Sequence, residues 1–185
     1  NFDGTGYNVA VGYDAGVAVT TGVQNTVVGG LAGDALTTGA GNTVMGYNAL
    51  SGEDTGSRNV AIGFESLKVQ NYNGNAYNVA IGYITGQTMT TGIQNTLIGS
   101  LSGNALTTGA ANVAVGYGAL GTEDAHGRNV AIGHNSLATL NAGADGNNVA
   151  VGYNAGVAMT SGVQNVVIGS LAGDALTTGS YNVAV

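Results

Sequence analysis

One asparagine returns along this chain at almost constant intervals, and this regularity restricts the possible folds more than any other feature of the sequence. Eight of the ten intervals measure 17 residues and the other two measure 19 residues. Each of the first ten asparagines opens a short apolar segment that a glycine closes, as in Asn8–Gly12 and Asn25–Gly29. The eleven asparagines are Asn8, Asn25, Asn42, Asn59, Asn78, Asn95, Asn112, Asn129, Asn148, Asn165 and Asn182.

A fixed period of this size is typical of solenoids, in which each repeat packs on its neighbours. We therefore predict an all-β fold, a β-solenoid or parallel β-roll of about 17-residue coils, with the main strand in the asparagine segment. Four kinds of coil recur as a 70-residue unit, here called a cassette, over residues 8–77, 78–147 and, in part, 148–185. Residues 1–7 resemble residues 71–77 and are expected to end a further long coil. Residues 1–185 are predicted to form a single repeat array.

The strand prediction rests on short runs that are rich in β-branched residues and bounded by glycine. Side chains alternate between two faces along a strand, so the second and fourth residues of each segment share a face. The fourth position always holds a larger apolar residue, and we predict that these residues form the core column. They are Val11, Val28, Met45, Ile62, Ile81, Ile98, Val115, Ile132, Val151, Ile168 and, in the last segment, Val185.

The third position lies on the opposite face and is also apolar. Where position two is Thr, position three is enlarged, as in Thr26-Val27 and Thr96-Leu97, which suggests close packing on this face too. Strands that are apolar on both faces are usually covered on both sides. Because a thin solenoid covers only one side, we expect more coils or other chains to cover the second.

The remainder of each coil is predicted to be a turn and a return strand that carries one bulky apolar residue, placed either at position nine or at position twelve of the coil. The residues at position nine are Leu50, Leu67, Leu120 and Leu137. Those at position twelve are Val19, Leu36, Met89, Leu106, Met159 and Leu176.

Composition excludes several classes of partner and site. The sequence contains no Cys and no Pro, so neither disulfides nor thiolate metal sites hold the fold. Only three residues are Lys or Arg, and the net charge is -7, so nucleic acid is not expected as a partner. No apolar run approaches the length of a transmembrane helix, so no membrane insertion is expected. We also expect no cofactor.

We interpret the asparagine column as a structural ladder of stacked amides that caps a turn in every coil. The alternative, a ligand-binding surface, is less consistent with a column that runs the whole length without a break. Thr pairs such as Thr20-Thr21 and Thr37-Thr38 suggest an ice-binding array, but the third and fourth kinds of coil interrupt the rank.

No residue is predicted to be catalytic or to bind a metal, and the chain is not expected to be an enzyme. The acidic pairs Glu53-Asp54 and Glu123-Asp124 could serve acid–base chemistry or bind Ca²⁺, but they lack a flanking ligand set. We interpret them as solvated turns with a weak ion pair to a nearby arginine. His126 and His134 each occur in one cassette only, and His134 stands where other coils carry an aromatic residue, so we interpret it as a spare aromatic.

The repeat resembles that of a known group of fibres. Asn42–Leu50, followed by Thr55-Gly56 and a new asparagine, resembles the 17-residue repeats of bacteriophage tail-fibre proteins. The core Asn-Val-Ala-Ile-Gly at Asn59–Gly63 and Asn129–Gly133 is similar to head repeats of trimeric autotransporter adhesins. This resemblance implies a trimeric, left-handed parallel β-roll with strands packed about a threefold axis, at a virion or cell surface. The 19-residue coils, and Gly30, Ser100 and Ser170 where the family favours Tyr, depart from the pattern.

We therefore expect a structural fibre or shaft protein with an adhesive role, of the tail-fibre or cell-surface adhesin type, in an extracellular location. Its expected partner is itself, as a homotrimer. The chain starts and stops inside a repeat, and we expect a host-surface glycan or receptor to bind through segments outside it. One alternative is a monomeric solenoid that polymerises head to tail into an extracellular filament. Another is a glycan-binding β-helix that uses its Tyr rows and carboxylates.

Overall fold

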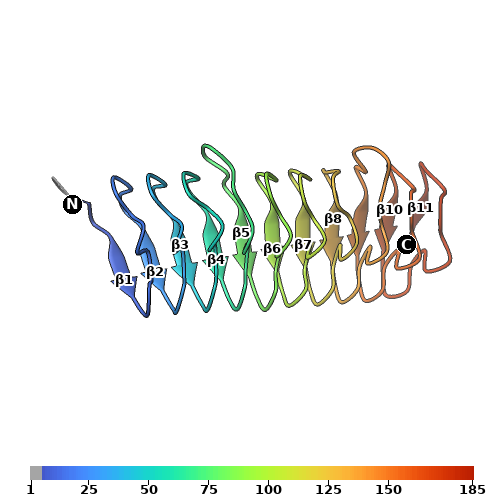
Figure 1. Cartoon of the computed structure of the whole chain (residues 1–185). Coiled ribbons are helices and arrows are strands. Elements are labelled where there is room, and N and C mark those ends of the chain that lie inside the picture. Colours follow the sequence, from blue (N-terminus) through green and yellow to red (C-terminus); the bar gives the residue numbers. More distant parts are fainter. Residues whose placement is uncertain (1–5) are drawn as a thin grey trace.

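The fold is a parallel β-solenoid, as predicted. The computed structural model describes residues 6–185, and the expectation for residues 1–5 lies outside them. Eleven strands lie side by side along one axis in sequence order (Figure 1). No helix in this part of the chain has the length and apolar character needed to cross a membrane. The strands are β1 (Val9–Val11), β2 (Thr26–Val28), β3 (Thr43–Met45), β4 (Val60–Ile62), β5 (Val79–Ile81), β6 (Thr96–Ile98), β7 (Val113–Val115), β8 (Val130–Ile132), β9 (Val149–Val151), β10 (Val166–Ile168) and β11 (Val183–Ala184).

Each strand pairs in parallel with the strand before it and the strand after it, and the asparagine segments stay in register throughout. Val60 pairs with Val79 and Val130 with Val149, although 19 residues separate each pair. The two extra residues of each long coil are therefore absorbed outside the sheet. Figure 1 shows the two resulting loops, residues 71–77 and 141–147, rising from the upper edge of the rod. With strands about 4.8 Å apart, the rod is roughly 50 Å long.

The strands are shorter than the predicted five-residue segments, and the predicted return strand is absent from residues 6–185. The return half of each coil consists of turns and bends. Its backbone enters the left-handed region repeatedly, for example at Asn48 (φ 58°), Leu50 (φ 50°) and Arg58 (φ 62°). A chain that changes hand at such intervals cannot remain extended, so only the asparagine segment forms a ladder.

The predicted core column is wrong for the single chain, because the interior is filled from the third position of each strand. Ala61, Ala80 and Leu97 are fully buried, whereas the side chain of Met45 at the fourth position is 47% exposed. After each strand the chain turns back across the side of the third residue, which leaves the second and fourth residues outside. The residues that lie on the outside are Val11, Val28, Met45, Ile62, Ile81, Ile98, Val115, Ile132, Val151, Ile168 and Val185.

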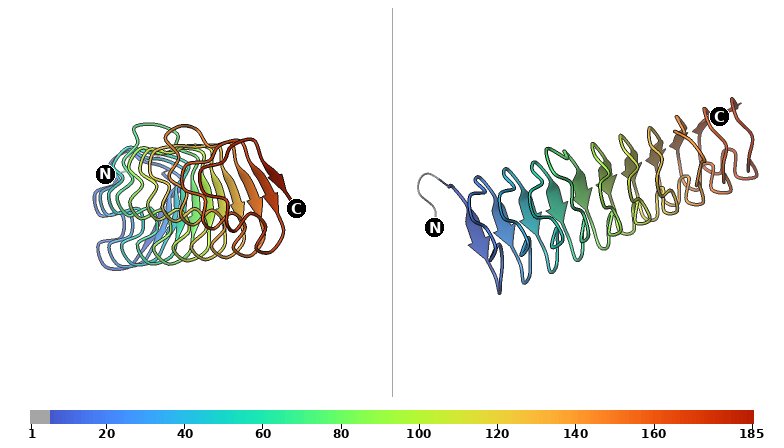
Figure 2. Two further views of the ribbon diagram at one scale, coloured as in Figure 1. Left: turned by 90° about the vertical axis from the view of Figure 1, so that its right-hand side faces the viewer. Right: turned by 45° about the horizontal axis from the view of Figure 1, so that its top comes forward.

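The bulky residues predicted for the return half do fill the interior. Leu50, Leu67, Leu120 and Leu137 are fully buried, as are Leu36, Met89, Leu106 and Met159, while Val19 and Leu176 pack at the two ends. Position nine is glycine where position twelve is bulky, and this leaves room for the neighbouring coils. A Cβ on Gly86 would lie 2.9 Å from Leu97 Cδ1 and 3.0 Å from Leu67 Cδ2. The coils consequently stack one behind another with nearly the same outline (Figure 2).

Candidate functional site

The outer side of the sheet is apolar along the whole rod. We call it the outward face and define it by the second and fourth positions of β1 to β11. In β2 to β10 these positions hold only Thr, Val, Ile and Met, and every one of them is partly or largely exposed. Ile98 and Ile168, for example, are 37% and 42% exposed. A continuous exposed apolar surface of this kind usually marks an interaction site.

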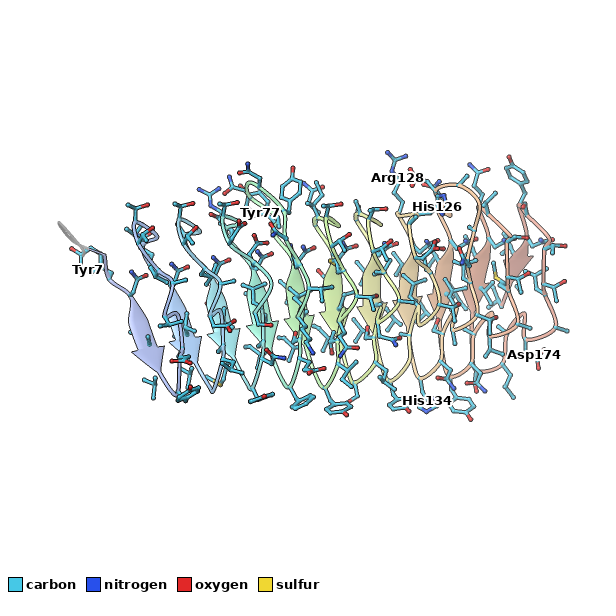
Figure 3. All side chains as sticks on the ribbon, in the orientation of Figure 1. Tyr7, Tyr77, His126, Arg128, His134 and Asp174 are labelled. Carbon is cyan, nitrogen blue, oxygen red and sulfur yellow. The ribbon has the colours of Figure 1, made fainter. Side chains whose placement is uncertain are left out.

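A row of aromatic side chains borders the outward face, just beyond the glycine that ends each strand. Tyr47, Phe64 and Tyr83 stack in succession, with ring centroids 5.6 Å and 5.4 Å apart. The second cassette repeats this stack with Tyr117, His134 and Tyr153, at 5.2 Å and 5.4 Å. His134 therefore occupies an aromatic slot, as the sequence indicated, and it lies along the lower edge of the rod (Figure 3).

The asparagines form a ladder at the opposite end of the strands. Asn95 is fully buried, and its Nδ2 donates to Gly109 O at 2.9 Å and to Asn78 Oδ1 at 3.3 Å. Its Oδ1 accepts from the backbone N–H of Asn112 at 2.9 Å. The same amide-to-backbone bond joins each asparagine from Asn8 to the next as far as Asn182. The column is thus consumed by internal bonding, and it acts as a structural element.

The long coils disturb this ladder locally. Asn42 Nδ2 donates to Gly56 O in the next coil, but the equivalent Nδ2 of Asn59 faces the long loop and has no partner. In the second cassette, Asn129 Nδ2 turns instead to Gly127 O at 3.3 Å. The extra residues therefore displace the carbonyl that regular coils supply.

Glu53 and Glu123 are not on solvated turns, contrary to the expectation from their sequence. Both side chains are completely buried, because both occupy position twelve, where other coils carry Leu or Met. Nor do they pair with arginine: Arg58 donates to the hydroxyl of Tyr77, and Arg128 pairs with Asp145 at 3.2 Å. A buried carboxylate requires hydrogen-bond partners, and backbone N–H groups supply them.

Each buried glutamate ties a long loop to the coil before it. Glu53 Oε1 accepts from Gly56 N at 2.7 Å, and Oε2 accepts from Tyr72 N in the first long loop at 3.1 Å. Glu123 Oε2 likewise accepts from Ala142 N in the second long loop at 3.2 Å. Burial raises the pKa of Glu53, and the hydrogen bonds from Tyr72 and Gly56 only partly oppose this effect.

This raised pKa predicts that protonation of Glu53 stabilises the fold. The contribution is complete below the pKa of an unfolded glutamate, about 4.3, and is lost as the pH rises through the higher value of the folded chain. We expect the free energy of unfolding of the native chain to gain on that of Glu53→Gln when the pH falls from about 7.5 to about 4.5. Urea titrations at the two pH values measure this difference. Asp54→Asn is the matched control, and a difference that stays constant or grows with rising pH would contradict the assignment.

The Thr hydroxyls of the return half are engaged within the rod. The Oγ1 of Thr37, for example, donates to Asp54 O at 3.0 Å, one coil further on. The same bond is made by Thr20, Thr90, Thr107 and Thr160. Because these hydroxyl hydrogens serve inter-coil bonds and the rank is interrupted, the array does not present the free, continuous Thr surface that ice binding requires.

The sequence reasoning missed two sets of residues. The first is the glycine that ends each strand, such as Gly116, whose backbone is left-handed and touches the next coil. The second is the pair of buried glutamates. Both could be found by aligning the coils, because Glu53 and Glu123 then fall in the column of Leu36 and Met89.

Comparison of the chain with protein-family models, curated proteins and solved structures gives no match. The function is therefore argued from the residues of this chain.

Proposed function

We propose that the chain is a segment of a structural fibre, in which three copies pack side by side through their outward faces. The observation that carries this proposal is the exposed apolar outward face, which follows the rod from β1 to β11. Exposed apolar area on this scale is stabilised when it is removed from water, at about 25 cal/mol per Å². The adhesive role and the extracellular or virion-surface location rest on the resemblance of the repeats to tail-fibre and adhesin repeats.

A second copy of this chain is the best match for the outward face, because the face is periodic. Its side chains recur at the spacing of parallel strands, about 4.8 Å, over roughly 50 Å. A partner that fills such a surface needs the same period, and another copy of the same array has it. The face carries no charged side chain on β1 to β11, so no charge opposes the approach of an identical surface.

The two alternatives use other parts of the molecule. Growth into a head-to-tail filament would use β1 and β11, each of which pairs on one side only. A glycan site would use exposed carboxylates, but Glu53 and Glu123 are buried within the coils. The outward face explains lateral association, whereas neither alternative explains why that face is apolar.

Charges on the outward face are expected to separate the copies. The double variant Ile98→Glu/Ile132→Glu places two carboxylates where a partner would exclude water, and an unpaired buried charge costs at least about 3 kcal/mol. That cost corresponds to a dissociation constant raised by more than about a hundredfold. Native mass spectrometry and light scattering should give three times the chain mass of 18.0 kDa for the native chain and the mass of one chain for the variant.

Thr91→Glu is the control, because Thr91 is exposed in the return half of its coil. It should leave the mass of the assembly unchanged. A native chain that is monomeric at micromolar concentration would exclude the proposal. Filaments of unlimited length in electron micrographs would favour end-to-end growth instead, and short rods of fixed length would favour the closed assembly.

A further inference from the structure

The two cassettes differ at one position next to the buried glutamate. In the first cassette Gly56 follows Glu53 by three residues, and in the second His126 follows Glu123 by three residues. The first cassette has no room for a side chain there, because a Cβ on Gly56 would lie 2.3 Å from Glu53 Cδ. The hydrogen bond from the backbone N–H to Oε1 is correspondingly longer in the second cassette, 3.3 Å against 2.7 Å.

His126 directs a nitrogen atom at the buried carboxylate. Its Nδ1 lies 3.4 Å from Glu123 Oε1, and this Nδ1 is buried without a hydrogen-bond partner. Asp124 adds a second carboxylate, and one ligand atom from each of the three residues lies within 4.8 Å of the others. Glu123 is fully buried, and Asp124 and His126 are partly buried. His126 marks the upper edge of the rod, beside Arg128 and opposite His134 (Figure 3).

We propose that Glu123, Asp124 and His126 form a binding site for one zinc ion per chain. Two ligands about 2.0–2.1 Å from a tetrahedral ion lie about 3.4 Å apart, which is the separation of Glu123 Oε1 and His126 Nδ1. Asp124 completes the set by rotation of its partly exposed side chain. One imidazole and two carboxylates suit zinc, whereas Ca²⁺ and Mg²⁺ bind through oxygen ligands alone.

The ion would reinforce the second long loop. Glu123 Oε2 accepts from Ala142 N in that loop, and Gly127 N, next to His126, donates to Asp145 Oδ1 at 3.1 Å. Zinc held by Glu123 and His126 would therefore fix both sides of the connection between the third and fourth coils of the second cassette. The first cassette, with glycine at the same position, would keep its loop through hydrogen bonds alone.

Isothermal titration of the full chain with zinc chloride tests the proposal. We expect saturable binding at one ion per chain. His126→Gly, which introduces the residue that the first cassette carries, should weaken binding by more than about tenfold, since loss of a ligand costs at least as much as loss of an outer-shell partner. Glu123→Gln should weaken it similarly. Glu53→Gln is the matched control and should bind zinc as the native chain does, and circular dichroism verifies that each variant folds.

The two histidines provide a second readout that does not depend on stability. Zinc should shift the imidazole nitrogen resonances of His126 in the NMR spectrum and leave those of His134 unchanged. No saturable binding, unchanged binding to His126→Gly, or a shift of His134 alone would each overturn the proposal. An unaltered titration in the presence of excess zinc would leave His126 and Glu123 as a simple ion pair and would likewise reject the metal site.

Discussion

Gly116→Ala is expected to lower the free energy of unfolding by roughly 2–5 kcal/mol. Gly116 has a φ of 136°, a region that side chains other than that of glycine rarely enter. A Cβ at this position would also lie 2.4 Å from Gly133 O in the next coil, so the two coils would have to separate. Because Gly133 N donates to Val115 O within the same junction, separation would also weaken the ladder.

Thermal and urea denaturation of the full chain measure this loss. Gly143→Ala is the control, since Gly143 is exposed and a Cβ there would meet no atom within 4 Å. Its effect should stay within about 0.5 kcal/mol, as for most surface substitutions. Equal stability of the two variants would show that the glycine column is not a constraint on the stacking of coils.

Asn95→Ala is expected to lower the free energy of unfolding by roughly 2–5 kcal/mol. Asn95 is fully buried, and its removal would leave the N–H of Asn112 and the carbonyl of Gly109 without their partners at 2.9 Å. Each buried polar group left unsatisfied costs about 1–3 kcal/mol. The amide also bonds Asn78, so the defect would interrupt the ladder between three coils.

Asn75→Ala provides the comparison for this loss. Asn75 is exposed in the first long loop, so its substitution should change stability little. Hydrogen exchange adds a local readout, because the backbone N–H of Asn112 should lose protection in Asn95→Ala. Protection equal to that of the native chain would mean that the side-chain amide of Asn95 contributes little to the closed structure.

The period of the asparagines was sufficient to predict the architecture. A 17-residue spacing that is kept over the whole chain leaves little choice but a stack of coils, and the register of Val60 with Val79 shows that even the long coils obey it. The plugs at positions nine and twelve were also predicted, because the exchange between Leu50 and Leu36 preserves one bulky group in each coil.

The choice between the two faces of the strand could not be made in the same way. Residues such as Ile98 and Leu97 are both apolar, and strand alternation shows only that they lie on opposite sides. The inner side is decided by the direction of the turn after the strand, and that depends on left-handed residues such as Leu50, which have no clear sequence signature. Residue size misled the prediction, since the small Ala61 is inside and the larger Ile62 is outside.

The environment of Glu53 was missed for a related reason. A charged residue in a run with Asp54 and Thr55 is typical of a solvated turn, and local sequence gives no hint that it is buried. The information lies in the column formed by equivalent residues of neighbouring coils, which is a long-range property. The backbone N–H groups of Gly56 and Tyr72, which make the burial tolerable, become visible only in three dimensions.

The strands cross the axis of the rod, and the bonds between them run along it, so tension on the two ends would act on the coils in series. Each coil is attached only to its neighbours. A terminal coil could then peel away while the others remain intact, releasing 17 residues that extend to roughly 55–60 Å in place of about 5 Å of rod. Such a shaft would lengthen in steps and dissipate a sudden load, where a rod held by a single central core would break all at once.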